Sequence, residues 1–223
     1  PDLPTNPFWP PSFDAAIFDF DGTLAITADL WHEVDITWLE ARGLEFDIDF
    51  PRQLSIMGFK EGARYVIERY GIDESPEDIC DEWNAMGRRL YITHVHLREG
   101  ALEYLQELRK AGVRLALATT NAIEVLESMH HNIDIYELFD QVVCINEIGG
   151  TKKTPDIYLE AARRLGVAPE RCIVFEDLLA GIRSAHRAGM MTCGVFAHDP
   201  LQDIELVQDA ADVFINSWKE VRS

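Results

Sequence analysis

The chain has 223 residues, of which 47% are hydrophobic and 26% charged, and its formal net charge at pH 7 is −19. This length is sufficient for a sizeable core, arranged as one domain with an insertion or as two small domains. The negative charge, together with the lack of any run of Lys or Arg, argues against nucleic acids and anionic membranes as main partners. An anionic substrate would need a local positive site, because the charge of the whole molecule repels it.

Cysteine usage and hydropathy exclude further classes of protein. The four cysteines are far apart and form no C-x-x-C pair, so we expect free thiols rather than disulfides or a zinc site. No apolar run approaches the roughly 20 residues that a membrane span requires. The proline-rich beginning has neither the basic start nor the apolar middle of a signal peptide. A soluble cytoplasmic protein is therefore expected.

The N-terminal segment, residues 1–11, contains five prolines and is predicted to be a flexible arm. The apolar stretch Phe13–Phe18 follows and predicts the first strand. Asp19 and Asp21 come at its end, and because side chains alternate along a strand, both carboxylates point the same way and repel each other. A hard metal ion would relieve this repulsion. Gly22 allows a sharp turn, although an Asp-Gly pair is also an ordinary turn signal.

The segment 28–96 has the pattern of helices and no convincing strand. Its best-marked helix begins after Ser75, with Pro76 at the first helical position and the acidic Asp78 three residues after the cap. We predict that this segment is a helical cap domain, inserted after the first strand of the core. The expected helices are Asp29–Ala41, Pro51–Met57, Phe59–Tyr70 and Pro76–Tyr91.

Beyond this insertion, apolar strand-like runs alternate with helical patterns. This alternation is typical of βαβ units, so we predict an α/β fold: a doubly wound, Rossmann-like parallel sheet built from residues 12–27 and 97–223. Each predicted helix is closely followed by a glycine. The predicted strands are Val113–Ala118, Gln141–Ile145, Cys172–Phe175, Thr192–Val195 and Val213–Ile215, and the predicted helices are Ala101–Lys110, Pro155–Leu165 and Leu178–Ala188.

Polar residues follow the strands at the points where the strands end. In an open α/β sheet, ligands bind at the carboxyl ends of the strands. Thr119, Thr120 and Asn121 follow the second predicted strand and precede a helix start, whose free N–H groups suit an anion. A simple role as helix N-cap is the alternative. A second acidic pair, Glu176 and Asp177, follows the fourth predicted strand.

Two lysines, Lys152 and Lys153, lie in a glycine-containing loop before the helix at Pro155. Taken alone they would be solvated charges. At the same sheet edge as the acidic residues, however, a lysine can hold phosphate oxygens while the carboxylates hold Mg²⁺. One aspartate then remains free to act as a nucleophile or as an acid–base group.

With these residues, the chain resembles the haloacid dehalogenase superfamily, in particular its phosphatase and phosphomutase branch with a helical cap. The resemblance covers nearly everything from residue 15 onward and rests on four motifs in the expected order. The motifs are Asp19-Phe20-Asp21-Gly22-Thr23, Leu115-Ala116-Leu117-Ala118-Thr119 followed by Thr120-Asn121, Lys152 ahead of Thr154-Pro155-Asp156, and Val174-Phe175-Glu176-Asp177.

The resemblance implies catalytic roles. Asp19 would attack phosphorus and become an aspartyl phosphate. Asp21 would protonate the leaving alcohol and then activate water for hydrolysis. Thr119 and Lys152 would hold the transferring phosphoryl group. The further phosphate-binding residues would be Gly22, Thr120 and Asn121.

The resemblance also implies a Mg²⁺ site. The ion would be bound by the Asp19 carboxylate, by Asp21 through its backbone carbonyl, by Asp177, and by Glu176 directly or through water. Metal and lysine together would offset the repulsion between carboxylate and phosphate that otherwise prevents the attack.

Three positions depart from the family pattern. Lys153 replaces the usual proline, which leaves Lys153 as the alternative to Lys152 for the motif lysine. Ile26 and Thr27 replace a common Asp-Ser pair. Trp31 occupies the position of a histidine that assists β-phosphoglucomutase-like relatives, and this counts against mutase activity.

The leading hypothesis is a Mg²⁺-dependent phosphatase for a small phosphomonoester of the sugar phosphate, phosphoglycolate or nucleotide type. A phosphosugar mutase is the alternative, whereas dehalogenases of this superfamily lack the second aspartate. Among non-enzymes, a phospho-aspartate receiver-like or catalytically inactive binding protein would not turn over p-nitrophenyl phosphate. Lys60 and Arg64 of the cap are candidate substrate contacts, with solvated helix charges as the other explanation. We expect a monomer, with a dimer as the alternative.

Overall fold

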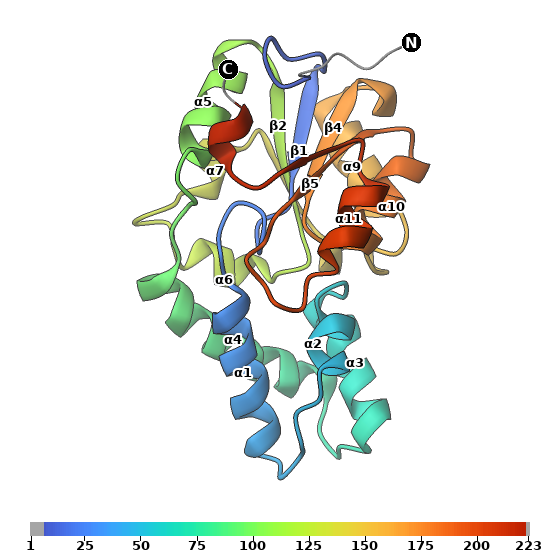
Figure 1. Cartoon of the computed structure of the whole chain (residues 1–223). Helices are drawn as coiled ribbons and strands as arrows, with labels where there is room; N and C mark the ends of the chain where they lie inside the picture. Colours follow the sequence, from blue (N-terminus) through green and yellow to red (C-terminus); the bar gives the residue numbers. More distant parts are fainter. Residues whose placement is uncertain (1–6, 222–223) are drawn as a thin grey trace.

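Parallel strands form the sheet on which the molecule is built. The computed structural model describes residues 7–221 (Figure 1). The six strands are ordered β3-β2-β1-β4-β5-β6 and every pairing is parallel. This order reverses next to β1, as in doubly wound folds, and confirms the predicted α/β fold class. The strands are β1 (Ala15–Phe18), β2 (Arg114–Thr119), β3 (Gln141–Cys144), β4 (Cys172–Glu176), β5 (Met191–Val195) and β6 (Val213–Ile215).

Both faces of the sheet are covered, which explains why its strands are almost continuously apolar. Along β1, Ala16 and Phe18 belong to the hydrophobic cluster on one face, and Ala15 and Ile17 to the cluster on the other. The first cluster includes side chains of α5 (Ala101–Lys110), α6 (Ile123–Glu127) and α7 (Ile135–Leu138), and the second includes those of α9 (Asp156–Leu165) and α10 (Leu179–Arg187).

The helical segment after β1 has a hydrophobic cluster of its own, in which the rings of Trp38 and Trp83 lie 5.4 Å apart between centroids. Ser75 caps the last helix by accepting a hydrogen bond from the Asp78 N–H at 3.1 Å, as its sequence indicates. Figure 1 shows these helices beyond one edge of the sheet. They are α1 (Ala28–Glu40), α2 (Asp49–Leu54), α3 (Phe59–Tyr70) and α4 (Pro76–His94).

We propose to divide the chain as its sequence suggests. Residues 28–96 are the cap, and residues 12–27 with 97–223 are the core. The separate hydrophobic cluster of α1–α4 supports this division.

Short elements account for most differences from the predicted secondary structure. Ile145, expected to end a strand, instead begins α8 (Ile145–Ile148), and α4 runs to His94, beyond its predicted end at Tyr91. Helices of about one turn contain too few residues to display a 3.6-residue period, so the sequence pattern does not reveal them. The further elements not predicted are α7, α11 (Ile204–Ala210), and the 3₁₀ turns η1 (Pro169–Arg171) and η2 (Trp218–Val221).

The described part of the N-terminal segment packs on the core. Phe8 is buried, and its ring centroid lies 6.5 Å from that of Tyr104 and 6.0 Å from that of Phe175. Residues 1–6 lie outside the described residues, so the flexibility of the arm 1–11 stays a prediction.

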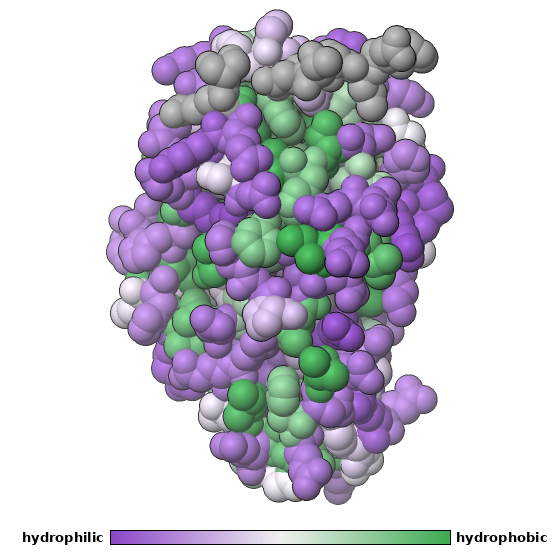
Figure 2. All heavy atoms as spheres, in the orientation of Figure 1, coloured by the Kyte–Doolittle hydropathy of each residue, from purple (hydrophilic) through white to green (hydrophobic). Residues whose placement is uncertain are grey.

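The cysteines and the surface agree with the composition. All four cysteines are free thiols, three of them buried and Cys80 partly exposed. Hydrophilic side chains cover most of the face shown in Figure 2, with hydrophobic ones along its middle and on the cap. Within residues 7–221, no helix combines the length and the apolar character needed to cross a bilayer.

Candidate active site

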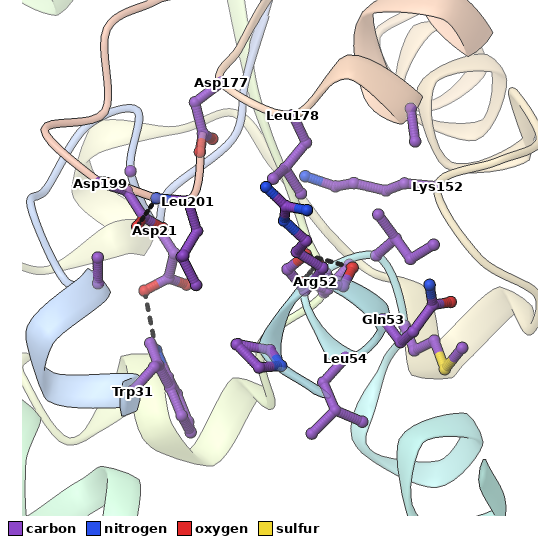
Figure 3. Close-up of a pocket in the computed structure, with 18 of the residues that line it drawn as sticks. Asp21, Trp31, Arg52, Gln53, Leu54, Lys152, Asp177, Leu178, Asp199 and Leu201 are labelled. Carbon is purple, nitrogen blue, oxygen red and sulfur yellow. Dashed lines mark hydrogen bonds between the residues drawn. The ribbon is translucent and has the colours of Figure 1, made fainter. Parts of the chain in front are cut away.

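A cavity of about 700 Å³ is lined by the strand ends of the core on one side and by the cap on the other. Its core side includes Asp19 and Asp177, and its cap side includes residues of α1, α2 and the segment after α2. Figure 3 shows Asp177 and Lys152 entering from the core, with Arg52 and Leu54 of α2 opposite them. The cavity therefore lies at the edge of the sheet where a ligand is expected.

The end of β1 brings two aspartates and a glycine to this cavity. Asp19 is buried, and its N–H bonds to the carbonyl of Phe175 at 3.0 Å, which ties it to β4. Gly22 has a φ of +85°, and a Cβ there would lie 2.4 Å from Oδ2 of Asp177. Glycine is thus required where the chain turns under the Asp177 carboxylate.

Lys152 is the buried lysine of the site, with an exposed fraction of 0%. Its Nζ lies 2.6 Å from Oδ1 of Asp19 and 2.6 Å from Oε2 of Glu176. Although burial opposes a charged ammonium group, the two carboxylates raise the pKa of Lys152. Lys153 is exposed at the rim of the cavity. The structure therefore places Lys152, rather than Lys153, beside Asp19.

Glu176 receives hydrogen bonds on both carboxylate oxygens. Oε2 accepts from Lys152 and from the hydroxyl of Tyr158 at 2.7 Å. Oε1 accepts from the backbone N–H groups of Asp177 and Leu178, each at 3.1 Å. With this set of donors, Glu176 orients Lys152, and contact with a metal through water suits it better than direct binding.

The carboxylates of Asp19, Glu176 and Asp177 form a buried acidic cluster, with oxygen atoms within 4.8 Å of one another. When all three carboxyl groups are ionised, their three negative charges and the one positive charge of Lys152 give the cluster a net charge of −2. Burial, followed by repulsion from Glu176, raises the pKa of both Asp19 and Asp177. A divalent cation would balance this charge, and oxygen ligands suit Mg²⁺. The residues therefore fit the metal that the resemblance implies.

The carboxylate of Asp21 is held by donors from the cap, from Thr27 just before the cap, and from Asn121 just after β2. Its Oδ1 accepts hydrogen bonds from the hydroxyls of Thr27, at 2.8 Å, and Tyr91. Its Oδ2 accepts from the amide of Asn121 at 3.0 Å, and the indole N–H of Trp31 lies 3.3 Å from Oδ1. Four hydrogen-bond donors thereby fix the position of the Asp21 side chain.

The proton of Tyr91 has a defined direction in this network. The Tyr91 oxygen receives hydrogen bonds from the N–H of Trp31 at 2.7 Å and from the amide N–H of Asn121 at 3.1 Å. The amide orientation of Asn121 is set because its oxygen accepts from the N–H of Ala122. Since both partners can only donate, the single hydroxyl proton of Tyr91 points to Asp21.

The polar residues at the end of β2 and just after it make different contacts. Thr119 is fully buried, and its hydroxyl accepts from the N–H of Asn121 at 2.9 Å. Thr120 donates to the carbonyl of Ser55 in the cap at 3.2 Å. The N-cap of α6 is Ala122, without a side-chain cap, so the N-cap alternative for Thr119–Asn121 is wrong. Because α6 has only five residues, the expected anion site at a helix start has little support.

Lys60 and Arg64 do not reach the cavity, so the structure corrects their placement as candidate substrate contacts. Both are exposed and neither lines the cavity, and Arg64 pairs with Glu61 at 3.4 Å. The two residues are four apart and share the solvated face of the helix. The buried residues of α3 are Gly62, Ala63 and Val66.

Other cap residues, which the sequence did not single out, contact the site instead. Arg52 lines the cavity, and its guanidinium group lies 3.6 Å from Asp203 of the core. The carbonyl of Ile56 accepts from the N–H of Lys152 at 2.9 Å, so the cap contacts the loop that carries the lysine.

Comparisons with known proteins agree with this geometry. The model of the family described as haloacid dehalogenase-like hydrolase matches residues 16–195. A curated protein of Thermotoga maritima named phosphorylated carbohydrates phosphatase is 31% identical over 209 residues, which cover 93% of this chain and 96% of that protein. Protein CbbY of Cereibacter sphaeroides is 33% identical over 188 residues, which cover 79% of this chain and 81% of that protein.

The chain is also similar to a solved structure in three dimensions. A CbbY variant from Rhodobacter sphaeroides in complex with xylulose-(1,5)bisphosphate superposes with a TM-score of 0.81. The two chains are 27% identical, and the match covers 93% of this chain and 96% of that chain.

Proposed function

The chain belongs to the haloacid dehalogenase-like hydrolase family and is a phosphoric monoester hydrolase, and on this premise we propose that it cleaves a small phosphorylated metabolite through Asp19. One relative is named as a phosphatase of phosphorylated carbohydrates, which supports this substrate class. The observation that carries the proposal is the 2.6 Å contact between Lys152 and Asp19, with Asp21 held nearby by separate donors. Two carboxylates in such different surroundings suit two different roles.

In the first half of the reaction, Asp19 attacks phosphorus and the bond to the leaving oxygen breaks. Lys152 offsets the negative charge that the carboxylate and the phosphoryl group bring together. Asp21 gives its proton to the leaving oxygen, which departs as an alcohol. The products of this half are the free alcohol and an aspartyl phosphate on Asp19.

In the second half, water attacks phosphorus while Asp21, now a carboxylate, takes the proton from water. Asp19 leaves as a carboxylate and inorganic phosphate is released. The hydrogen bonds from Thr27, Tyr91 and Asn121 orient Asp21 for this acceptance.

Mg²⁺ is part of the proposal because the three buried carboxyl groups, once ionised, and Lys152 together carry a net charge of −2. When bound, the ion would offset the repulsion between nucleophile and phosphate. Asp19, Asp177 and the backbone carbonyl of Asp21 would hold it, with Glu176 through water. Gly22, Thr119, Thr120 and Asn121 are the proposed phosphate-binding residues.

We favour hydrolysis over a mutase reaction. A mutase must protect its aspartyl phosphate from water until a bisphosphate intermediate has turned around. Trp31 stands where related mutases carry an assisting histidine, and its N–H already contacts Asp21 and Tyr91. If the enzyme converted glucose 1-phosphate to glucose 6-phosphate faster than it released phosphate, a mutase reaction would be favoured over hydrolysis.

We also propose a partner, a cellular location and an oligomeric state for the enzyme. The partner is a small phosphorylated metabolite, without nucleic acid or membrane, in keeping with the net charge of −19. We propose a cytoplasmic monomer, with a dimer as the alternative.

The proposal is tested by phosphate release from p-nitrophenyl phosphate and from a panel of sugar, glycolate and nucleoside monophosphates. We expect steady turnover that stops with chelator and returns with Mg²⁺. Asp177→Asn should raise the Mg²⁺ concentration needed for half-maximal activity, with the exposed Glu33→Gln as control. Absence of turnover with every ester, or activity that is indifferent to chelator, would contradict the proposal.

A further inference from the structure

Asp35 is a buried acid at the cap end of the cavity. It lies on α1, is 8% exposed and lines the cavity. Within residues 7–221 its side chain has no hydrogen-bond or ion-pair partner. Burial alone raises its pKa to about 7.

No structural role explains this residue. The other buried residues of α1 are Val34, Trp38 and Leu39, all of them hydrophobic. An unpaired buried carboxyl group costs free energy in the folded protein, whereas an apolar residue on the same face would stabilise it. A feature that costs stability and faces a cavity points to a ligand.

The position of Asp35 fixes which part of a substrate it meets. Trp31 lies one helical turn before it, a rise of about 6 Å along α1, and the Trp31 indole contacts Asp21. Asp21 acts on the leaving oxygen in the proposed reaction, so Asp35 lies further along the path of the leaving group. The walls of the cavity at the cap also include Leu54, Phe59 and Trp83.

We propose that Asp35 is a specificity-determining residue that accepts a hydrogen bond from a hydroxyl or amino group on the distal part of the leaving group. This inference rests on the proposed phosphatase function and narrows its substrate class. A carboxyl group among apolar walls is matched by a donor and mismatched by a second acid. Leaving groups that place a phosphate or carboxylate at this point are therefore excluded, and a leaving group as short as glycolate does not reach it.

The other titratable groups of the cap that line the cavity do not replace this acceptor. Arg52 lies near Asp203 of the core, and Asp49 is exposed. His32 lies one turn before Asp35 on the same helix and can bind the same part of a ligand. Asp35 is the one buried carboxyl group that the described cap contributes to the cavity.

The test compares Asp35→Asn, Asp35→Leu and the control Glu33→Gln, an exposed residue of α1 that does not line the cavity. The substrates are p-nitrophenyl phosphate, neutral sugar and polyol monophosphates, and amino-sugar monophosphates. The measured quantity is the ratio of kcat/KM for each metabolite to that for p-nitrophenyl phosphate. This ratio separates distal recognition from the chemistry at Asp19.

For Asp35→Leu we expect this ratio to fall by about 30-fold or more for the best metabolite, the size of a hydrogen bond to a charged or buried acceptor. Asp35→Asn keeps an acceptor oxygen but loses the negative charge. In this variant, metabolites that donate from a hydroxyl group should keep most of the wild-type ratio, whereas metabolites that donate from an ammonium group should not. Glu33→Gln should match the wild type. Melting temperatures of all variants verify that they are folded.

Two results overturn the inference. The first is a ratio within about threefold of wild type in both Asp35 variants. The second is a wild-type enzyme that hydrolyses no donor-bearing metabolite better than p-nitrophenyl phosphate. A wild type that hydrolyses no ester at all would instead overturn the proposed function, and the inference with it.

Discussion

At the core end of the cavity the buried charges have partners, whereas at the cap end Asp35 has none among residues 7–221. Lys152 contacts two carboxylates, and Glu176 receives hydrogen bonds on both of its oxygens. The core end is therefore arranged before any substrate arrives, as transition-state stabilisation requires. The cap end leaves an acceptor for the substrate to satisfy. We therefore infer that the core carries out the chemistry and that the cap selects the leaving group.

Asp19→Asn tests the core end with the largest expected effect. An amide cannot act as the nucleophile, so we expect kcat to fall by about 10⁴-fold or more. The fold should persist, and the melting temperature should rise, because removing one carboxylate relieves the repulsion within the acidic cluster. Activity above about one per cent of wild type with p-nitrophenyl phosphate would refute the assignment of Asp19.

Lys152→Ala and Lys153→Ala form a matched pair of neighbouring lysines. We expect Lys152→Ala to cost at least about 2 kcal/mol more in kcat/KM, because only Lys152 contacts Asp19. Since removal of a buried cation also destabilises the core, the folded fraction is verified by thermal melting, and Lys152→Met, which keeps the volume, serves as a second variant. An equal or reversed effect would move the phosphate-holding role to Lys153.

The pH dependence of the free energy of unfolding tests whether Asp35 is buried without a partner at the cap end of the cavity. The pKa of Asp35 is about 7 in the folded protein, above its value of about 4 in the unfolded chain. At pH values between about 4 and about 7, the folded state therefore binds more protons than the unfolded state. Stability then falls as pH rises from about 4 to about 7. We expect Asp35→Asn to remove this loss and to be more stable than wild type at pH 8, by on the order of 2 kcal/mol.

Denaturant unfolding at pH 5 and pH 8 measures this difference. The gap between Asp35→Asn and wild type should widen toward pH 8, while Glu33→Gln should show no such gap. A gap independent of pH would show that Asp35 is not titrating in this range.

Tyr91→Phe tests the contact between cap and core at Asp21. The variant keeps the ring and removes one proton donated to the carboxylate. We expect kcat to fall by about tenfold with little change in KM, because the hydroxyl orients an acid–base group and does not bind substrate. The exposed Tyr136→Phe is the control. A rise in KM at unchanged kcat would mean that Tyr91 contributes to binding instead.

The sequence predicted the core better than the cap, and the reason is physical. Asp19, Lys152, Glu176 and Asp177 follow strands or loops that a parallel sheet must gather at one edge, so their meeting follows from the topology. Tyr91 lies 70 residues from Asp21, and their contact depends on how α4 packs, which no local pattern specifies. Long-range packing of this kind is therefore visible only in the structure.

The prediction of substrate contacts in the cap was limited in the same way, because it also depends on how the helices pack. The sequence predicts Lys60 and Arg64, near the start of a cap helix, as substrate contacts. In the structure both are exposed and lie on the side of α3 opposite its buried residues, which are Gly62, Ala63 and Val66. Helical periodicity alone would have placed them on the solvated face. The sequence does not indicate a role for Asp35, because a single acidic residue on an amphipathic helix has the pattern of a surface residue and only the structure shows that it is buried.

The most direct test of the central claim uses Asp21→Asn and p-nitrophenyl phosphate. p-Nitrophenolate leaves without a proton, so the first half of the reaction should proceed, whereas the second half lacks its base. We expect a burst of one equivalent of p-nitrophenolate per active site, and mass spectrometry of acid-quenched protein should find the phosphoryl group on Asp19. The absence of a burst, or a phosphoryl group on any other residue, would contradict the account.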